Sequence, residues 1–236
     1  MIQAVLFDFN GVVIDDEPLH LKAFQEVLSS EGVALTEEDY YSMLGTDGET
    51  FVRAAFERTG AELTDELLRS VVEREAAAHR ELLTGELPLF PGVDTFIKAL
   101  SHKYPLGVVS MSRRAEINYA LERAGLARHF SVIVSSEDVS ACKPDPECYR
   151  RGLERLNETR GQSHVLPYRP DECLVIEDAP PGVRAARSAG MRSLGVTNTV
   201  GEQALREAGA DSVTRSLADW TVDAVHHVFD TEWGRR

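Results

Sequence analysis

The sequence predicts an α/β protein in which a doubly wound, Rossmann-like parallel sheet forms the core and carries an inserted all-helical cap domain. The apolar run at residues 2–7, interrupted only by Gln3, is typical of a strand buried on both faces. Residues 16–87 carry apolar residues at helical spacing and no convincing strand. From Pro91 onwards, short apolar segments alternate with helical ones, which indicates right-handed crossovers between parallel strands.

The first half of the chain supplies one strand and then only helices. Apolar spacing predicts three helices, and a glycine follows each of them: residues 19–28 before Gly32, 51–56 before Gly60, and 63–83 before Gly85. We expect residues 16–87 to form the cap, with a small core of its own. Residues 1–15 and 88–236 then form the main core, and the hinges between the two parts are expected at residues 15–17 and 85–88.

The second half of the chain supplies the rest of the sheet. Strands are expected at residues 105–110, 130–134, 173–176 and 192–196. Helices are expected at residues 93–100, 114–124, 146–156, 182–189 and 217–229. The polar segment 157–171 is expected to be a surface connection.

Charge and composition exclude several classes of protein. The formal net charge of −14 disfavours nucleic acid and anionic membranes as partners, and no apolar segment is long enough to span a bilayer. The N-terminus lacks the basic and apolar regions of a signal peptide. Cys142, Cys148 and Cys173 are odd in number and lack CxxC spacing, so neither a disulfide framework nor a zinc site is expected. We expect a cytoplasmic protein, present as a monomer or weak homodimer.

Polar side chains follow the predicted strands at the points where the strands end. Asp8, Ser110 and the pair Glu177 and Asp178 occupy such ends, and Lys143 lies just past another. In a parallel sheet these ends share one edge, where open α/β folds bind ligands. Carboxylates gathered there need a cation, and oxygen ligands with a substrate phosphate suit Mg²⁺. The pattern therefore predicts a Mg²⁺ and phosphate site with Asp8 as nucleophile.

Each of these residues also has a plainer interpretation. Asp8 could stabilise a turn, Ser110 could cap a helix, and Lys143 could be a solvated loop residue. Glu177 and Asp178 could cap the helix that Pro180 opens. Taken together, these interpretations leave unexplained why every one of the residues falls at a strand end.

Four motifs in order then resemble the haloacid dehalogenase (HAD) superfamily, and within it the branch of sugar-phosphate phosphatases and β-phosphoglucomutase. The motifs are Asp8-Phe9-Asn10-Gly11-Val12-Val13, Ser110, Lys143-Pro144-Asp145-Pro146 and Glu177-Asp178-Ala179-Pro180-Pro181-Gly182-Val183. The resemblance covers nearly the whole chain, including the helical insertion, which this family uses as a mobile cap.

The resemblance implies a role for each matching residue. The catalytic residues would be Asp8, which attacks phosphorus, Asn10, which stands at the acid–base position, and Ser110 and Lys143, which hold the phosphoryl group. The Mg²⁺ ligands would be Asp8, the backbone carbonyl of Asn10, and Glu177 and Asp178. Substrate contacts are expected from Ser110, Met111, Ser112, Lys143 and His20.

Asn10 departs from the family, which usually has Asp at this position. An amide keeps the backbone carbonyl for the metal, but it cannot release and regain a proton near neutral pH. General acid–base help is worth roughly 10²–10⁴-fold, so we expect weak hydrolysis unless Glu17 or His20, which lie near the hinge, substitutes. Replacing Asn10 by Asp is then expected to raise the rate. A natural residue is favoured over a degenerate enzyme or an engineered substitution that traps a phospho-enzyme.

The favoured function is a Mg²⁺-dependent phosphatase that acts on a small phosphorylated metabolite through an aspartyl-phosphate. One alternative is a phosphonate or other carbon-centred hydrolase, but Lys22, the only lysine between Asp15 and Gly85, does not fit a Schiff-base role in the cap. A phosphoglucomutase-like enzyme is disfavoured because the segment from Gly45 to Phe51 contains no Arg. The last alternative is a phosphate-ligand binder without turnover.

Overall fold

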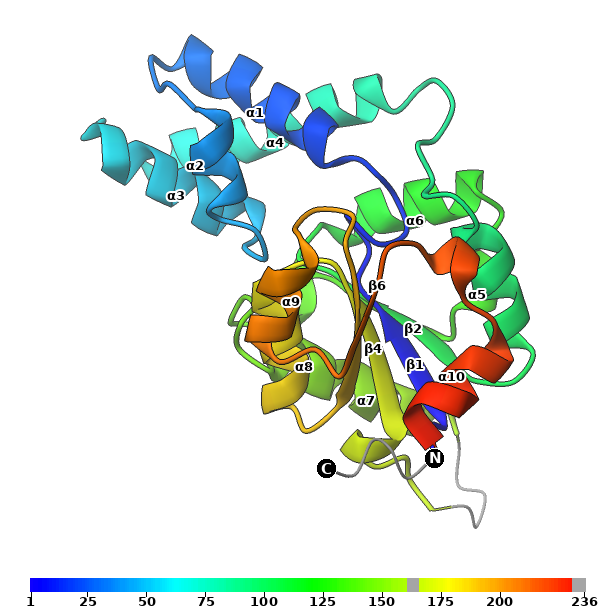
Figure 1. Ribbon diagram of the computed structural model, residues 1–236. Coiled ribbons are helices and arrows are strands. Elements are labelled where there is room, and N and C mark those ends of the chain that lie inside the picture. The colour runs from blue at the N-terminus through cyan, green and yellow to red at the C-terminus, as the bar shows by residue number, and fades with distance from the viewer. Residues whose placement is uncertain (161–165, 231–236) are drawn as a thin grey trace.

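A six-stranded, all-parallel sheet forms the centre of the computed structural model, which describes residues 1–160 and 166–230 (Figure 1). The strand order is β3-β2-β1-β4-β5-β6, and every neighbouring pair runs parallel. The strands are β1 (Ala4–Phe7), β2 (Leu106–Val109), β3 (Val132–Val134), β4 (Cys173–Glu177), β5 (Arg192–Val196) and β6 (Ser212–Thr214). The predicted α/β fold class is confirmed.

Helices cover both faces of the sheet. One face carries α5 (Val93–Ser101), α6 (Arg114–Arg123) and α10 (Val222–Asp230), and the other carries α7 (Glu147–Thr159) and α8 (Pro180–Ser188), beside which α9 (Glu202–Ala208) packs. Strand β1 is wholly buried, because Val5 and Phe7 join one hydrophobic cluster while Ala4 and Leu6 join the other. This explains why its sequence is a continuous apolar run.

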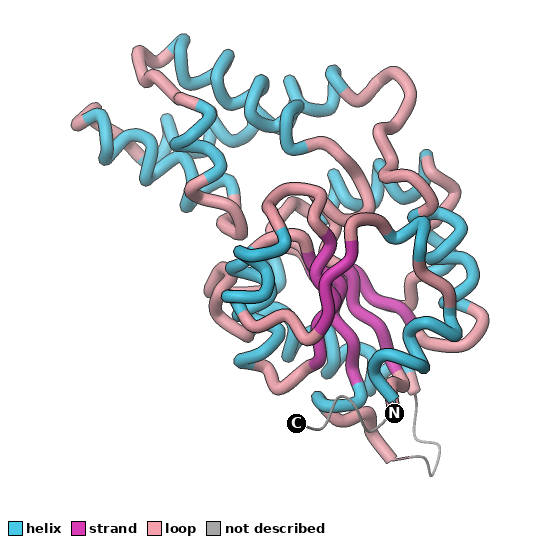
Figure 2. Tube along the Cα trace, in the orientation of Figure 1, coloured by secondary structure: helices cyan, strands magenta, loops and turns pink. Residues whose placement is uncertain are grey.

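Four helices between β1 and α5 form a separate layer beyond the carboxyl edge of the sheet (Figures 1 and 2). They are α1 (Glu17–Ser30), α2 (Glu37–Tyr41), α3 (Gly48–Thr59) and α4 (Asp65–Leu82). Thr36, Asp47 and Thr64 cap the last three with their side-chain oxygens. A hydrophobic cluster of their own, which includes Phe24 and Phe56, holds them together. We call this layer the cap; the boundaries at residues 16 and 87 stay predictions.

The two connections to the cap run side by side. The N–H of Asp15 donates to the carbonyl of Pro88 at 2.7 Å, and Ile14 and Leu89 form an isolated antiparallel bridge. The chain therefore leaves the core and returns to it at neighbouring points.

Three expectations from the sequence are wrong in detail. Residues 217–229 are not one helix: a 3₁₀ turn at Leu217–Asp219 ends before α10, because the hydroxyl of Thr221 accepts the N–H of Ala224 and starts a new helix. Helices α2 and α9 and edge strand β6 were not predicted, since they have only five, seven and three residues and little apolar periodicity. Lys143 lies nine residues beyond the end of β3 rather than just past a strand.

Other expectations hold within the part of the chain that the structure describes. The remaining predicted helices and strands of the core agree to within a few residues at each end. Of the expected loop at 157–171, residues 161–165 lie outside the described residues, and α7 extends to Thr159. All three cysteines are free thiols. None of the described helices has the length and apolar character that a membrane crossing requires.

Candidate active site

The carboxyl ends of the central strands bring Asp8 and Glu177 to one place, where Lys143 joins them. Asp8 follows β1 directly, and its N–H continues the ladder to the carbonyl of Ile176 at 2.9 Å. The Nζ of Lys143 lies 2.7 Å from Asp8 Oδ1 and 2.7 Å from Glu177 Oε1. The Lys143 side chain is only 3% exposed, so one buried cation is shared by two carboxylates.

Burial sets the charge states of this group. It raises the pKa of Asp8 to about 7, although the charge of Lys143 opposes the change. Burial also disfavours the charge on Lys143, but Asp8 and Glu177 outweigh it and raise its pKa above the ordinary range. These shifts favour the charged form of Lys143, and any further positive charge beside Asp8 favours the ionised form of Asp8.

Glu177 is held rigidly. Its Oε1 accepts from Lys143 and from the hydroxyl of Tyr149 at 2.6 Å. Its Oε2 accepts the N–H groups of Asp178 at 3.1 Å and Ala179 at 3.3 Å. A Cβ on Gly182 would overlap this carboxylate, which explains the glycine at that position.

Asp178 completes a group of three carboxylates. The oxygens of Asp8, Glu177 and Asp178 offer ligand atoms within 4.8 Å of one another. Burial, then Glu177 and Asp8, raise the pKa of Asp178 well above its ordinary value, and the hydroxyl of Thr199 donates to its Oδ2. Three buried acids at this spacing suit a hard divalent cation with oxygen ligands, so the residues present fit Mg²⁺.

The absence of a side chain at Gly11 leaves space for the Asp178 carboxylate. Its φ of +74° lies in the left-handed region, and a Cβ there would overlap Asp178 Oδ2. The carbonyl of Gly11 accepts from the side chain of Asn198 at 2.7 Å, which ties the turn after β1 to the loop after β5.

Asn10 lies beside the two serines that follow β2. Its Oδ1 accepts from the hydroxyl of Ser110 at 3.0 Å and from that of Ser112 at 2.7 Å. Its Nδ2 donates to both oxygens of Asp16, at 3.0 Å and 3.1 Å. A phosphoryl group that accepts a hydrogen bond from the Ser110 hydroxyl must therefore replace Asn10 as the acceptor.

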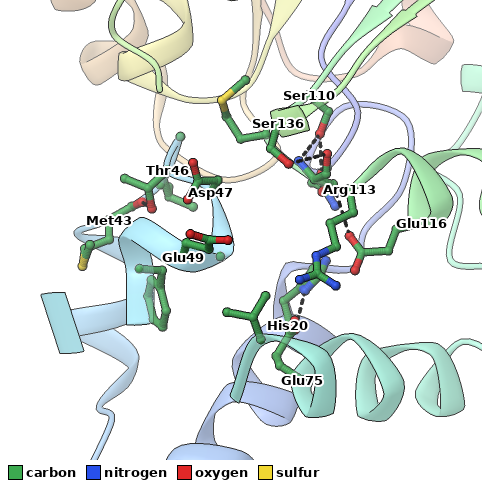
Figure 3. Close-up of a pocket in the computed structure, with 18 of the residues that line it drawn as sticks. His20, Met43, Thr46, Asp47, Glu49, Glu75, Ser110, Arg113, Glu116 and Ser136 are labelled. Atoms are coloured by element: carbon green, nitrogen blue, oxygen red, sulfur yellow. Dashed lines mark hydrogen bonds and ion pairs between the residues drawn. The ribbon is translucent and has the colours of Figure 1, made fainter. Parts of the chain in front are cut away.

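A cavity of about 440 Å³ opens between this edge of the sheet and the cap (Figure 3). From the core it is lined by Asp8, Asn10, Ser110, Met111, Ser112, Arg113 and Lys143. From the cap, Figure 3 shows Thr46, Asp47 and Glu49 on one side and His20 with Glu75 on another. Every residue expected to contact substrate thus lines one cavity, while Glu177 and Asp178 lie outside its lining.

The cap side of the cavity is also acidic. Glu75 Oε1 lies 2.8 Å from His20 Nδ1; burial would lower the pKa of His20, but Glu75 outweighs it and raises that pKa to about 10. Glu17 accepts the hydroxyl of Tyr40 at 2.5 Å, and burial raises the pKa of its carboxyl. The ring of His20 stacks on that of His79, with the centroids 3.5 Å apart.

Sequence reasoning missed several partners in this region. Tyr149 and Thr199, which hold Glu177 and Asp178, carry no signal in the sequence. Glu75 and His79 could have been found from the sequence, because they are polar residues four positions apart on the buried face of α4.

The motifs, the fold and the carboxylate group agree with the comparison to known proteins. A family model described as "Haloacid dehalogenase-like hydrolase" matches residues 5–196. This chain belongs to the haloacid dehalogenase-like hydrolases. As a member of this family it is an enzyme of the hydrolase class, as the motifs predicted.

Relatives whose names state an activity match most of the chain. A "Phosphorylated carbohydrates phosphatase" from Thermotoga maritima is 32% identical over 220 residues, which are 91% of this chain and 94% of that protein. "Fructose-1-phosphate phosphatase YqaB" from Escherichia coli is 28% identical over 81% of this chain and 95% of its own length. A β-phosphoglucomutase structure from Clostridium difficile superposes with a TM-score of 0.87 over 100% of both chains at 22% identity, which shows the shared fold.

Proposed function

We propose that this chain is a Mg²⁺-dependent phosphatase that hydrolyses a small phosphorylated metabolite through an aspartyl-phosphate on Asp8. The observation that carries the proposal is the place of Asp8, which lines the cavity and touches Lys143. Glu177 and Asp178 offer further metal-ligand oxygens beside it.

A sugar phosphate is the substrate class that the comparisons favour. The names of the Thermotoga maritima and Escherichia coli relatives refer to phosphorylated carbohydrates and fructose 1-phosphate. A cavity of about 440 Å³ suits one small metabolite. The cap loop presents Thr46, Asp47 and Glu49 to the cavity and no cation (Figure 3), which speaks against mutase chemistry.

The chain's own residues divide the chemistry between them. In the first step an Asp8 oxygen attacks phosphorus, the bond from phosphorus to the substrate oxygen breaks, and a general acid of the site gives the leaving alcohol its proton. In the second step water attacks the phosphorus, the bond from phosphorus to the Asp8 oxygen breaks, the same acid–base group takes up the proton that the water loses, and phosphate leaves. Lys143 and Ser110 hold the phosphoryl oxygens, and Met111, Ser112 and His20 contact the substrate. Asp8, the Asn10 carbonyl, Glu177 and Asp178 would hold Mg²⁺, which would neutralise phosphoryl charge when bound.

Glu17 is the better of the two expected substitutes for the missing acid. Both Glu17 and His20 line the cavity. The raised pKa of the Glu17 carboxyl keeps it protonated closer to neutral pH, as a general acid requires. His20 holds its proton too firmly for this role, because Glu75 raises its pKa to about 10.

A screen of phosphorylated metabolites with and without Mg²⁺ tests the proposal, with Asp8→Asn as the control. We expect Mg²⁺-dependent release of phosphate from at least one sugar phosphate and a loss of roughly 10³-fold or more in the control, as removal of a nucleophile gives. Binding without release would instead show a phosphate-ligand binder. Metal-independent halide release from haloacids would show a dehalogenase.

A further inference from the structure

Asp16 lies in direct contact with the unusual Asn10. Both of its oxygens accept from Asn10 Nδ2, at 3.0 Å and 3.1 Å. The usual family pattern has a carboxylate at position 10, which this site lacks. It has instead the carboxylate of Asp16, which lies behind Asn10 as seen from the cavity and is hydrogen-bonded to it.

Asp16 does not touch the substrate space. It is 1% exposed and is absent from the lining of the cavity, whereas Asn10 belongs to it. Any effect of Asp16 on the reaction must therefore pass through Asn10.

An N-capping hydrogen bond to helix α1 does not explain why residue 16 is Asp. It occupies the N-cap position of α1, where Asp usually accepts a backbone N–H, but its side chain makes no such bond. Instead Oδ2 lies 3.4 Å from His79 Nε2 and 3.7 Å from His20 Nε2. The carboxylate is thus held between Asn10 of the core and two histidines of the cap.

The carboxylate dictates which way the Asn10 amide points. An amide has donors on nitrogen only and acceptors on oxygen only. With Nδ2 facing Asp16, Oδ1 faces the hydroxyls of Ser110 and Ser112 and accepts from both. The reverse orientation would place the amide oxygen against the two Asp16 oxygens, which act as acceptors here.

We propose that Asp16 is a positioning residue that acts through Asn10, and that positions 10 and 16 work as one amide–carboxylate pair. The proposal rests on the proposed phosphatase function of the same site. It predicts that kcat survives when Asn10→Asp and Asp16→Asn are combined, whereas either substitution alone lowers kcat. Asn10→Asp alone sets two buried carboxylates about one hydrogen-bond length apart, so the rate gain expected from the sequence requires Asp16→Asn as well.

The test is a cycle of four proteins: the wild type, Asn10→Asp, Asp16→Asn and the double variant. kcat and KM are measured with the best sugar phosphate and Mg²⁺, and the melting temperature of each protein is recorded. Residues in contact couple by roughly two- to hundredfold. We expect each single variant to lose about tenfold or more in kcat with KM changed less than about twofold. In the double variant the amide introduced at position 16 donates to the new carboxylate, so kcat returns to the wild-type level or above it.

Two outcomes overturn the proposal: effects on kcat that multiply independently in the double variant, or an Asp16→Asn variant with wild-type kcat. Asp65→Asn is the matched control, because Asp65 is 78% exposed in the cap and its loss should leave kcat unchanged. A general loss of folding would appear as equal falls in melting temperature without recovery in the double variant, which also contradicts the pair.

A measurement that needs no turnover separates this proposal from the proposed function. The side-chain NH₂ signals of Asn10, assigned by their loss in Asn10→Asp, are compared by NMR between the wild type and Asp16→Ser. A changed chemical shift and faster hydrogen exchange are expected once the carboxylate is gone. Unchanged signals refute the positioning role, whether or not any metabolite is hydrolysed.

Discussion

Removing the cation that Asp8 and Glu177 share should destabilise the metal-free protein strongly. In Lys143→Met, side chains that are 12% and 1% exposed lose their counter-charge. Breaking a buried pair by removing one partner costs about 3–5 kcal/mol. For a chain of this size, about 2–4 °C is lost per kcal/mol, so the melting temperature should fall by roughly 6–20 °C.

Thermal denaturation at neutral pH with a chelator present measures this effect. The matched control is Lys98→Met, which breaks the pair with Asp94 on the surface, where the side chains are 45% and 42% exposed. That pair is worth about 0–1 kcal/mol, so the control should stay within about 4 °C of the wild type. Mg²⁺ should raise the melting temperature of Lys143→Met more than that of the wild type. Equal falls in the two variants would refute the electrostatic reasoning.

Three further outcomes are expected. Gly11→Ala should weaken Mg²⁺ binding and phosphatase activity by about tenfold or more, since the new Cβ displaces Asp178; in a Mg²⁺ titration, Gly60→Ala, which has a similar φ of +69° and open space, should show no such loss. His20, whose pKa rises from 6.5 to about 10 on folding, stabilises the protein fully below pH 6.5 and progressively less up to pH 10. Chemical denaturation across this pH range measures the free energy of unfolding, which should depend less steeply on pH in Glu75→Gln than in the wild type. An unchanged dependence would contradict the role of Glu75 in raising the pKa of His20. Glu17→Gln should remove the fall in kcat at rising pH that ionisation of the Glu17 carboxyl causes; an identical pH profile in the variant would exclude Glu17 as the acid.

The sequence predicted which residues gather at the carboxyl edge of the sheet because one physical rule places them there. Parallel strands share a carboxyl edge, so Asp8, Ser110 and Glu177 had to lie near one another once their strands were recognised. The helical cap was predictable for a similar reason, since its apolar spacing is long and regular. The roles of these residues stay proposals until the variants are measured.

The contacts between the cap and the core could not be predicted in this way. They depend on how two separately packed layers meet. Asp16 reaches His79 of α4, and Cys142 beside Lys143 donates to Asp47 at 3.1 Å, from a position 95 residues away. No periodicity within either segment encodes such pairs. The short elements α2, α9 and β6 were missed because their positions depend on neighbouring packing more than on their own propensity.

The paired connections at residues 14–15 and 88–89 make the cap a module. The insertion leaves and re-enters at adjacent points and carries its own hydrophobic cluster, so the sheet order would survive its replacement. Chimeras that exchange this module between relatives should therefore retain the phosphoryl-transfer chemistry of the host and acquire the selectivity of the donor. In such grafts the residue at position 16 of the donor must be compatible with the residue at position 10 of the host, because the two lie on opposite sides of the junction and contact each other.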